Sequence, residues 1–331
     1  MRNILCFIFL FASFCACNLR AQARQWANFN VSNSGVPSNQ VYDIMIDRRG
    51  DAWVATLDSG FAVFKEGEWV KYNMRNSLLP HNSIYAIIQD RHGAEWIATS
   101  GGGLVKIEGG KWKIYNTRNS GLPEDYLYAV AADKHDNIFV GTTSEGLALL
   151  SKKGWTVFNR KNSGLPSPKV PSLLVDKKGT KWIGTLGGLA VFKDGKILPV
   201  KDSLLPGSSI YSLKADGRNN IWAGFKYEGL AFFDGKKWIN YNQNNSGLPS
   251  DEVRSVAIDT KNNVWIGTFG NGLVKFDGKT WTVYDSHNSG LPDDNIFHVT
   301  VDKFNNKWIG TLFRGLVIFN ESGIKNCPLV Q

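Results

Sequence analysis

Short hydrophobic runs, separated by polar turns rich in Gly, Asn and Asp, follow one another along this chain from about residue 24. In one stretch the runs are Val253–Ile258, Val264–Thr268, Leu273–Phe276 and Thr280–Tyr284. They are rich in β-branched and aromatic residues, which favour strands, and they are short for helices. We therefore predict four successive antiparallel strands. We also expect Asp277-Gly278 to form a type I′ hairpin turn, in which both central residues have positive φ.

The same unit recurs seven times. The motif Asn-Ser-Gly-Leu-Pro and its variants occupy residues 33–37, 76–80, 119–123, 162–166, 202–206, 245–249 and 288–292, and the prolines are 43, 43, 43, 40, 43 and 43 residues apart. The second run of each unit carries an aromatic residue: Trp53, Trp96, Phe139, Trp182, Trp222, Trp265 and Trp308. Four strands per period of about 40–45 residues describe a propeller blade. We predict an all-β fold, a single seven-bladed β-propeller over residues 24–331 with four antiparallel strands per blade.

The two ends of the repeat array complement each other. The seventh unit has no fourth run after Leu316–Phe319, whereas an extra run, Trp26–Phe29, precedes the first unit. We predict that this N-terminal strand completes the last blade and closes the ring, which removes two free strand edges. The fourth unit departs from the pattern, because Lys196–Val200 replaces its Trp-x-x-Tyr run. Pro199 lacks a backbone N–H, so we expect this run at an outermost edge.

The first 23 residues read as a targeting segment. Arg2 precedes the apolar run Ile4–Phe14, and Ala21-Gln22-Ala23 has the small-x-small pattern of a cleavage site. This predicts a secretory signal peptide over residues 1–23, and the run is too short to span a membrane. The alternative is a lipoprotein anchored through Cys17. Either reading predicts a periplasmic or extracellular protein. If cleavage follows Ala23, Cys327 alone remains and no internal disulfide can form.

Composition and charge narrow the class of protein. Hydrophobic residues make up 43% and charged residues 20% of the 331 residues, which excludes a disordered, collagen-like or coiled-coil chain. The formal net charge is +9, or +7 without the signal peptide. Basic residues gather in the turns after each first strand: Arg48, Arg49, Arg91, Lys134, Lys177, Lys178, Arg218, Lys261 and Lys303. We expect a solvated basic face; the alternative is a patch for lipid head groups or an acidic glycan. Nucleic acid is not an expected partner of an exported chain.

The pattern NSGLP…WIGT…GGL…F resembles the two-component regulator propeller repeat over essentially all of residues 24–331. The resemblance implies an exported sensor propeller of the kind joined to bacterial hybrid histidine kinases and associated with glycan sensing. This chain carries one ring, with no kinase, no immunoglobulin-like segment and no transmembrane segment in its sequence. We therefore expect a stand-alone, sensor-like binding propeller without its own signalling output. The alternative is a protein-interaction scaffold for a separate envelope receptor.

Residues that recur once per blade are interpreted as structural. All 12 Trp fall on two repeat positions, six on each, which favours packing between blades. The Asn and Gly of the NSGLP loops are expected to shape a turn. An Asp ends the first run of every unit and is expected to cap its own turn: Asp47, Asp90, Asp133, Asp176, Asp216, Asp259 and Asp302. These short turns lack the several oxygen ligands that calcium requires, and we expect no metal and no cofactor.

Candidate ligand-binding residues lie where the repeats differ. Five residues after the prolines stand Tyr42, Tyr85, Tyr128, Pro171, Tyr211, Arg254 and Phe297, which we expect to ring the mouth of the central channel. His298 follows this position, and the loops between second and third strands add Lys226, Tyr227 and Arg314. Aromatic faces contact the C–H surfaces of sugars, and Arg pairs with carboxylate or sulfate. We predict binding of a glycan or acidic sugar; the alternative is that the tyrosines only pack between blades.

A lyase is the leading enzymatic alternative. The chain contains no HExxH, GxSxG or P-loop motif and no Cys/His cluster with zinc spacing. Certain seven-bladed propeller lyases place His, Arg and Tyr at the channel mouth. By that resemblance, His298 would abstract a proton next to a carboxylate and Arg254 would neutralise the enolate. The sequence favours a binding protein over this enzyme.

Overall fold

The computed structural model describes residues 24–205, 207–327 and 329–330, and every regular element in this part of the chain is a β-strand. The predicted signal peptide over residues 1–23, and with it the choice between cleavage after Ala23 and lipidation at Cys17, lies outside the described residues. The described residues contain no helix long and apolar enough to cross a membrane.

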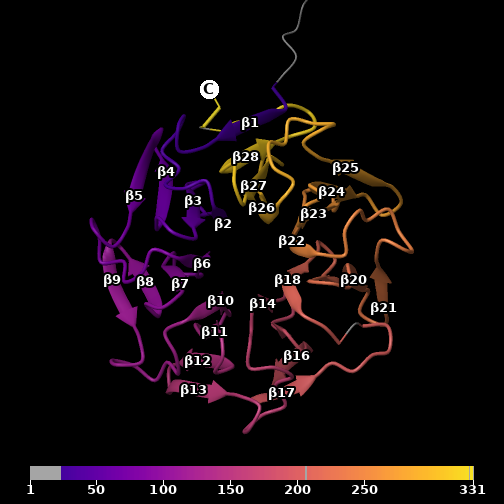
Figure 1. Ribbon diagram of the computed structural model, residues 1–331. Helices are drawn as coiled ribbons and strands as arrows, with labels where there is room; N and C mark the ends of the chain where they lie inside the picture. The colour runs from indigo at the N-terminus through magenta and orange to yellow at the C-terminus, as the bar shows by residue number, and fades with distance from the viewer. Residues whose placement is uncertain (1–23, 206, 328, 331) are drawn as a thin grey trace, which may run out of the picture.

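The strands form seven four-stranded antiparallel sheets arranged as blades around a central axis (Figure 1). Blades 1 and 2 consist of β2 (Val41–Ile46), β3 (Ala52–Thr56), β4 (Phe61–Lys65), β5 (Glu68–Tyr72), β6 (Ile84–Gln89), β7 (Glu95–Thr99), β8 (Leu104–Glu108) and β9 (Lys111–Tyr115). Blades 3 and 4 consist of β10 (Leu127–Ala132), β11 (Ile138–Thr142), β12 (Leu147–Ser151), β13 (Gly154–Phe158), β14 (Ser172–Val175), β15 (Lys181–Thr185), β16 (Gly188–Lys193) and β17 (Lys196–Pro199). Blades 5 and 6 consist of β18 (Ile210–Ala215), β19 (Ile221–Phe225), β20 (Leu230–Phe233), β21 (Trp238–Tyr241), β22 (Val253–Ile258), β23 (Val264–Thr268), β24 (Leu273–Phe276) and β25 (Trp281–Tyr284). Blade 7 consists of β26 (Ile296–Val301), β27 (Lys307–Thr311), β28 (Leu316–Phe319) and β1 (Trp26–Phe29).

The N-terminal strand closes the ring, as the repeat pattern predicts. β1 pairs antiparallel with β28, in a register that sets Trp26 opposite Phe319 and Phe29 opposite Leu316. The rings of Trp26 and Phe319 stack with centroids 3.8 Å apart and planes 14° apart. Figure 1 shows the indigo β1 lying along the yellow β28. Blade 7 is therefore a complete four-stranded sheet, and its first strand packs beside that of blade 1.

Tryptophans on the outer strands pack against glycines of neighbouring NSGLP loops. A Cβ added to Gly290 would lie 2.6 Å from the Trp26 ring, and one added to Gly121 or Gly247 would lie 2.6 Å from Trp155 or Trp281. These glycines do not have positive φ. The glycines lie in turns, as expected, but the reason for glycine there is different: a tryptophan of the next blade approaches the backbone too closely for a side chain.

The recurrent aspartates cap their turns, and in five blades they also bind the tryptophan of the second strand. The Asp259 carboxylate accepts hydrogen bonds from the Lys261 and Asn263 amides at 2.9 and 2.8 Å and from the Trp265 indole N–H at 3.0 Å. Equivalent indole bonds join Trp53 to Asp47, Trp96 to Asp90, Trp182 to Asp176 and Trp308 to Asp302. The capping role predicted from the sequence is confirmed, and the same carboxylates also fix the tryptophan rings in the inter-blade core.

Blade 3 has Phe139 in place of the tryptophan, and other groups occupy the free carboxylate oxygen there. Asp133 accepts hydrogen bonds from the Asn137 side chain at 2.9 Å and pairs with Lys181 of blade 4 at 3.1 Å. Burial alone would raise the pKa values of Asp133 and Asp259, but their hydrogen bonds outweigh burial and lower both pKa values.

One predicted turn type differs from the structure. At Asp277-Gly278 only Gly278 has positive φ, at 97°. The Asp277 carboxylate accepts hydrogen bonds from the Lys279 and Thr280 amides, which lengthens the loop to four residues, and β25 begins at Trp281. Asp194-Gly195 has positive φ at both residues, as a type I′ turn requires.

The basic residues predicted to gather on one side are all exposed, and their turns are linked to each other. Asn219, Asn262 and Asn305 have positive φ, and each side chain accepts a hydrogen bond from the turn of the preceding blade. Arg91 binds Asp136 of the next blade through two nitrogens, at 2.6 and 2.8 Å. This face therefore carries a chain of inter-blade bonds beneath its solvated charges.

After β28 the chain folds back over the seam between blades 7 and 1. The Ile324 amide donates to the Arg24 carbonyl at 2.8 Å, and Cys327 is buried in the hydrophobic cluster shared with Trp308 and Val41. Burial raises the pKa of the Cys327 thiol to about 11. The segment thus covers the seam with apolar packing.

A double-mutant cycle between Trp26 and Gly290 tests the closure of the ring. We expect Gly290→Ala to lower the free energy of unfolding by about 2 kcal/mol, because the new methyl group overlaps the Trp26 ring. Trp26→Ala alone should lower it by about 3 kcal/mol through lost aromatic packing. In the Trp26→Ala background, Gly290→Ala should cost less than about 0.5 kcal/mol. Urea unfolding measures the four proteins, and an equal cost of Gly290→Ala in both backgrounds would contradict the contact.

Acid should weaken the fold through the turn aspartates. Their lowered pKa values mean that they stabilise the folded state above an unfolded pKa of about 4, and that this stabilisation is lost as the pH falls through the folded pKa. Between about pH 5 and about pH 3, Asp259→Asn should lose less unfolding free energy than the wild type. The exposed Asp58→Asn is the matched control and should follow the wild type. An unchanged pH dependence in Asp259→Asn would count against this role.

Candidate functional site

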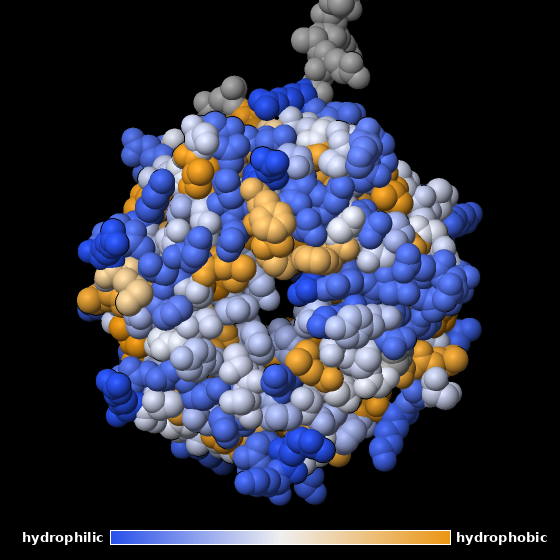
Figure 2. Space-filling view, in the orientation of Figure 1, coloured by the Kyte–Doolittle hydropathy of each residue, from blue (hydrophilic) through white to orange (hydrophobic). Residues whose placement is uncertain are grey.

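A cavity of about 630 Å³ lies in the central channel, between the inner strands of the blades. All seven residues at the position five after the prolines line it, including Tyr128 and Arg254, as the repeat register predicts. The channel opens at the centre of the face seen in Figure 2, where hydrophobic groups lie beside the opening. Leu57, Leu186 and Phe269, which follow second strands, add apolar wall.

Aromatic rings cover one side of the cavity in a continuous series. The ring centroids of Tyr42 and Tyr85 are 4.7 Å apart, those of Tyr85 and Tyr128 are 5.3 Å apart, and those of Tyr42 and Phe297 are 5.2 Å apart. Burial, and then the neighbouring Tyr85, raise the pKa of Tyr42, and the same two causes raise the pKa of Tyr128. Both hydroxyls therefore remain protonated at neutral pH and can donate hydrogen bonds to a ligand.

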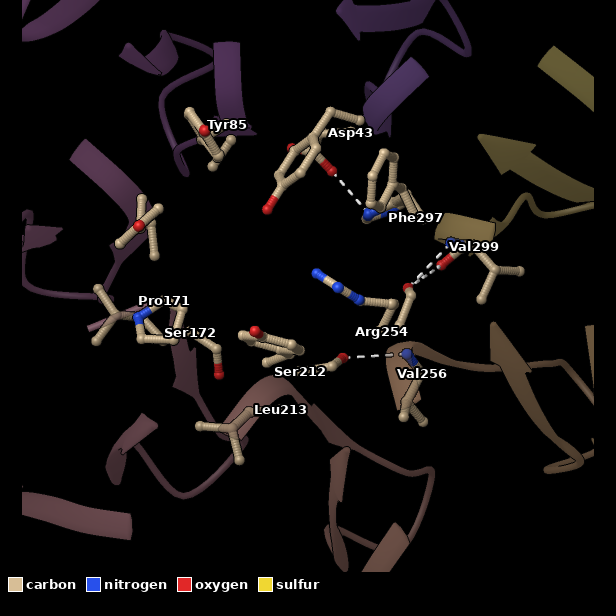
Figure 3. A pocket seen from close by; sticks show the side chains of 18 of the residues that line it. Asp43, Tyr85, Pro171, Ser172, Ser212, Leu213, Arg254, Val256, Phe297 and Val299 are labelled. Carbon is tan, nitrogen blue, oxygen red and sulfur yellow. Dashed lines mark hydrogen bonds and ion pairs between the residues drawn. The ribbon is translucent and has the colours of Figure 1, made fainter. Parts of the chain in front are cut away.

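Arg254 extends from β22 into the cavity among three aromatic rings (Figure 3). Its guanidinium carbon lies 4.5 Å from the centroid of Tyr211, 5.1 Å from Phe269 and 5.7 Å from Phe297. Its terminal nitrogen pairs with Glu252, while its buried Nε has no hydrogen-bond partner among the described residues. The cation is thus held by ring faces and one carboxylate, and the pair offers both donors and an acceptor.

His298 is oriented by Asp43 of the neighbouring blade. Its Nδ1 lies 2.9 Å from an Asp43 carboxylate oxygen. A carboxylate accepts hydrogen bonds, so this contact assigns the proton of a neutral imidazole to Nδ1 and leaves Nε2 free. Asp43 also accepts hydrogen bonds from the Ile44 and Ile87 amides at 2.9 and 2.7 Å, which joins blades 1 and 2.

Two serines make the same inter-blade connection elsewhere in the channel. Ser212 accepts a hydrogen bond from the Val256 amide and Ser255 from the Val299 amide, each at 3.0 Å (Figure 3). Ser212, Ser255 and Asp43 occupy the same repeat position. The channel wall is therefore cross-linked at this level by side chains that reach from one blade to the next.

Three residues predicted for the site do not line the cavity: Lys226, Tyr227 and Arg314. Lys226 Nζ instead lies 4.7 Å from the ring centroid of Tyr227, which is 61% exposed. The repeat pattern predicts that whole loops lie at the mouth. In the structure, only the first residue of each such loop reaches the cavity in blades 1, 4, 6 and 7, as Leu57 and Leu312 do.

Two charged residues in the cavity wall were not predicted as site residues, namely Asp43 and Lys214. Lys214 pairs with Trp222 across β18 and β19, a position at which the other blades have uncharged residues such as Met45 and Ala257. Desolvation lowers the pKa of Lys214, although Asp43 opposes this. Lys214 is the one charged residue at its repeat position, and Asp43 is the one carboxylate at a position that otherwise holds Ala, Ser or His. The same comparison of repeats could have found both.

Substitution of Asp43 tests the inter-blade connection. We expect Asp43→Ala to lower the free energy of unfolding by about 2 kcal/mol, because the buried Ile87 amide loses its acceptor. Asp43→Ser should recover roughly half of this loss, since Ser212 and Ser255 make the equivalent bond. Urea unfolding measures both variants. Equal stabilities of the two variants would argue against the connection.

Comparisons with known proteins agree with this architecture. The family described as two component regulator propeller matches residues 35–58, 78–101 and 247–270, which cover loops and first two strands of blades 1, 2 and 6. No curated protein matches the chain. The extracellular domain of BT3049, described as a hybrid two component system of B. thetaiotaomicron, has a TM-score of 0.76 and 22% identity over 92% of this chain and 44% of its own.

Two further solved structures share the fold. PorZ, described as a surface component of the type-IX secretion system of Porphyromonas gingivalis, has a TM-score of 0.72 and 17% identity over 88% of this chain and 48% of its own. Virginiamycin B lyase from Staphylococcus aureus has a TM-score of 0.71 and 11% identity over 89% of this chain and 98% of its own. This chain spans less than half of BT3049 and PorZ, and identities this low show a shared fold only. The chain is therefore a seven-bladed propeller, and the repeats of blades 1, 2 and 6 match the two component regulator propeller family.

Proposed function

We propose that this protein is an exported, sensor-like propeller that binds a glycan, preferentially an acidic one, in its central cavity. The observation that carries the proposal is the Arg254 guanidinium held among three aromatic rings in the wall of a cavity of about 630 Å³. This volume is in the range of small-molecule sites. A sugar presents both apolar C–H faces and hydroxyl groups, and this wall offers partners for both.

The chemistry of the wall favours a carbohydrate over a purely apolar ligand. The faces of Tyr85 and Tyr128 suit sugar rings, and the protonated tyrosine hydroxyls donate hydrogen bonds. The Arg254–Glu252 pair can donate to ring oxygens and accept from hydroxyls. Lys214 adds positive charge, which favours a ligand that carries a carboxylate.

The fold neighbours support the sensor-like part of the proposal. BT3049 and PorZ are described as an extracellular domain of a two component system and as a bacterial surface component. By analogy, this chain would act outside the cytoplasm and signal to a separate envelope protein whether its ligand is bound. Membrane attachment through Cys17 or release after Ala23 would decide where it meets that partner.

Binding to purified residues 24–331 tests the proposal. Glycan arrays identify candidate ligands, and calorimetry then compares the wild type with Tyr128→Ala, Tyr211→Ala and Arg254→Ala. We expect each variant to bind at least about 10-fold more weakly, a loss of about 1.4 kcal/mol of binding free energy. Tyr227→Ala removes an exposed tyrosine outside the cavity and should bind like the wild type. Unchanged affinity in all three cavity variants would exclude this site.

The His298–Asp43 pair favours a lyase as the second candidate function. The free Nε2 of His298 would take a proton from the carbon next to a uronate carboxylate. The released electron pair forms a C=C bond as the adjacent C–O bond breaks, and the leaving oxygen takes up a proton. Virginiamycin B lyase shares the fold, which makes this use of the channel reasonable to test.

Ultraviolet absorbance of unsaturated uronate products separates the two functions. A lyase should generate this absorbance from an acidic polysaccharide, and His298→Ala should abolish it. Asp43→Asn should slow the reaction, because the imidazole loses the carboxylate that orients it. Absence of product from a panel of acidic polysaccharides that bind to the cavity would exclude the lyase and leave the binding function in place.

A further inference from the structure

Each first strand has one backbone amide at a fixed register position beside the channel. Because successive blades share this register, as the pairs Ile87–Ile97 and Val130–Val140 show, the N–H groups have the same orientation. In four blades a side-chain oxygen accepts this bond: Asp43 accepts from Ile44 and Ile87, Ser212 from Val256, and Ser255 from Val299. The position is thus a recurring donor toward the channel.

In blades 3, 4 and 5 the equivalent amides belong to Val130, Leu173 and Leu213, and no described side chain accepts from them. The residues that should supply the oxygen are Ala86 and Ala129, which have none, and Ser172. Ser172 is only 7% exposed, and its hydroxyl has no partner among the described residues. Buried amides in proteins are almost always hydrogen-bonded, so unfilled donors beside a cavity indicate a place for ligand oxygens.

Blade 1 shows what fills such a place. The Asp43 carboxylate joins the amide that follows it, Ile44, to the amide of the next blade, Ile87. Ala129 stands at the position of Asp43, and the two corresponding amides are Val130 and Leu173. All three residues line the cavity, and so does Ser172 (Figure 3 shows Ser172 beside Leu213). By this register, the two amides at Ala129 correspond to the pair that the Asp43 carboxylate joins in blade 1, and no described side chain accepts from them.

We propose that the carboxylate of an acidic sugar binds at Ala129, where it accepts hydrogen bonds from the Val130 and Leu173 amides as the Asp43 carboxylate does in blade 1. This inference rests on the proposed function and deepens it, because it assigns binding of the ligand's carboxylate to the backbone amides and binding of the sugar ring to the aromatic side chains. Arg254 is already paired with Glu252, so the open amides are the better carboxylate site. Tyr128, next to Ala129, then stacks on the attached ring, and Lys214 contributes positive charge to the same cavity.

Acetate is a probe for this site that does not depend on any glycan. In amide NMR spectra of residues 24–331, sodium acetate at up to roughly 0.1 M should shift the Val130 and Leu173 amide protons downfield in a saturable way. The Val256 and Val299 amides, which already donate to serines, are internal controls and should not move. Sodium chloride of equal ionic strength should not reproduce the shifts. Acetate spectra in which Val130 and Leu173 behave like the controls would overturn the proposal.

Two variants at one position distinguish the site from general packing. Ala129→Asp should place its own carboxylate on the two amides and abolish the acetate shifts, whereas Ala129→Gly leaves the amides open and should keep them. Calorimetry then compares a uronic acid trisaccharide with its carboxyl-reduced form. Ala129→Asp should weaken the acidic ligand at least about 10-fold and change the neutral one less than about 2-fold.

The outcomes separate this inference from the proposed function. If the acidic trisaccharide binds and loses affinity in Tyr128→Ala but not in Ala129→Asp, glycan binding stands and the carboxylate site is wrong. If acetate shifts the two amides but neither sugar binds, the anion site stands and the glycan function fails. Ala129→Asp and Ala129→Gly must each have a urea unfolding midpoint at or above that of the wild type. If the midpoint of Ala129→Asp is lower, it is replaced by Ala129→Ser, which mimics Ser212 and Ser255.

Discussion

The antiparallel pairing of β1 with β28 is the contact on which the remaining architecture depends. A propeller blade packs face to face with two neighbours, so each inner strand has a defined place only when the circle is complete. Without β1, blade 7 would be a three-stranded sheet with β28 as an exposed edge, which is a site for aggregation. Closure fixes β26 beside β2 and brings His298 within hydrogen-bond distance of Asp43. The candidate site is therefore created by the joining of the chain's first and last strands.

Residues that recur in most blades and residues that occur in only one blade have separate roles in this molecule. Groups that recur in most blades, such as the turn aspartates and the tryptophans they bind, hold the blades together. Groups that occur once, such as Arg254 and Lys214, lie in the channel wall. The position of Asp43 shows both roles at once, because serines at that position join blades while alanines leave donors open. Chemical variety in the channel thus arises on a scaffold whose stability depends on the shared residues.

Much of the fold could be read from the sequence because the repeat period carries topological information. The period gave seven equivalent blades, and the missing last run together with the surplus first run predicted the closing strand. Equivalence also placed Tyr42, Tyr128 and Arg254 around one channel. What the period cannot predict is which direction a side chain takes within a loop. Lys226, Tyr227 and Arg314 for that reason lie outside the cavity lining.

Local bonding between specific side chains also escaped prediction. The Asp277 carboxylate turned an expected two-residue hairpin into a longer loop, and Gly290 is required by the Trp26 ring rather than by its own φ. Both effects depend on atoms that a propensity rule does not consider.

The buried Cys327 has a consequence for the protein's redox chemistry. Its thiol lies in the cluster at the seam between blades 7 and 1, and burial raises its pKa to about 11. Only the thiolate attacks a disulfide, so at neutral pH this sulfur is a poor nucleophile as well as an inaccessible one. In an oxidising compartment, the folded protein would therefore resist mixed-disulfide formation and covalent dimerisation through Cys327 for as long as the seam stays packed.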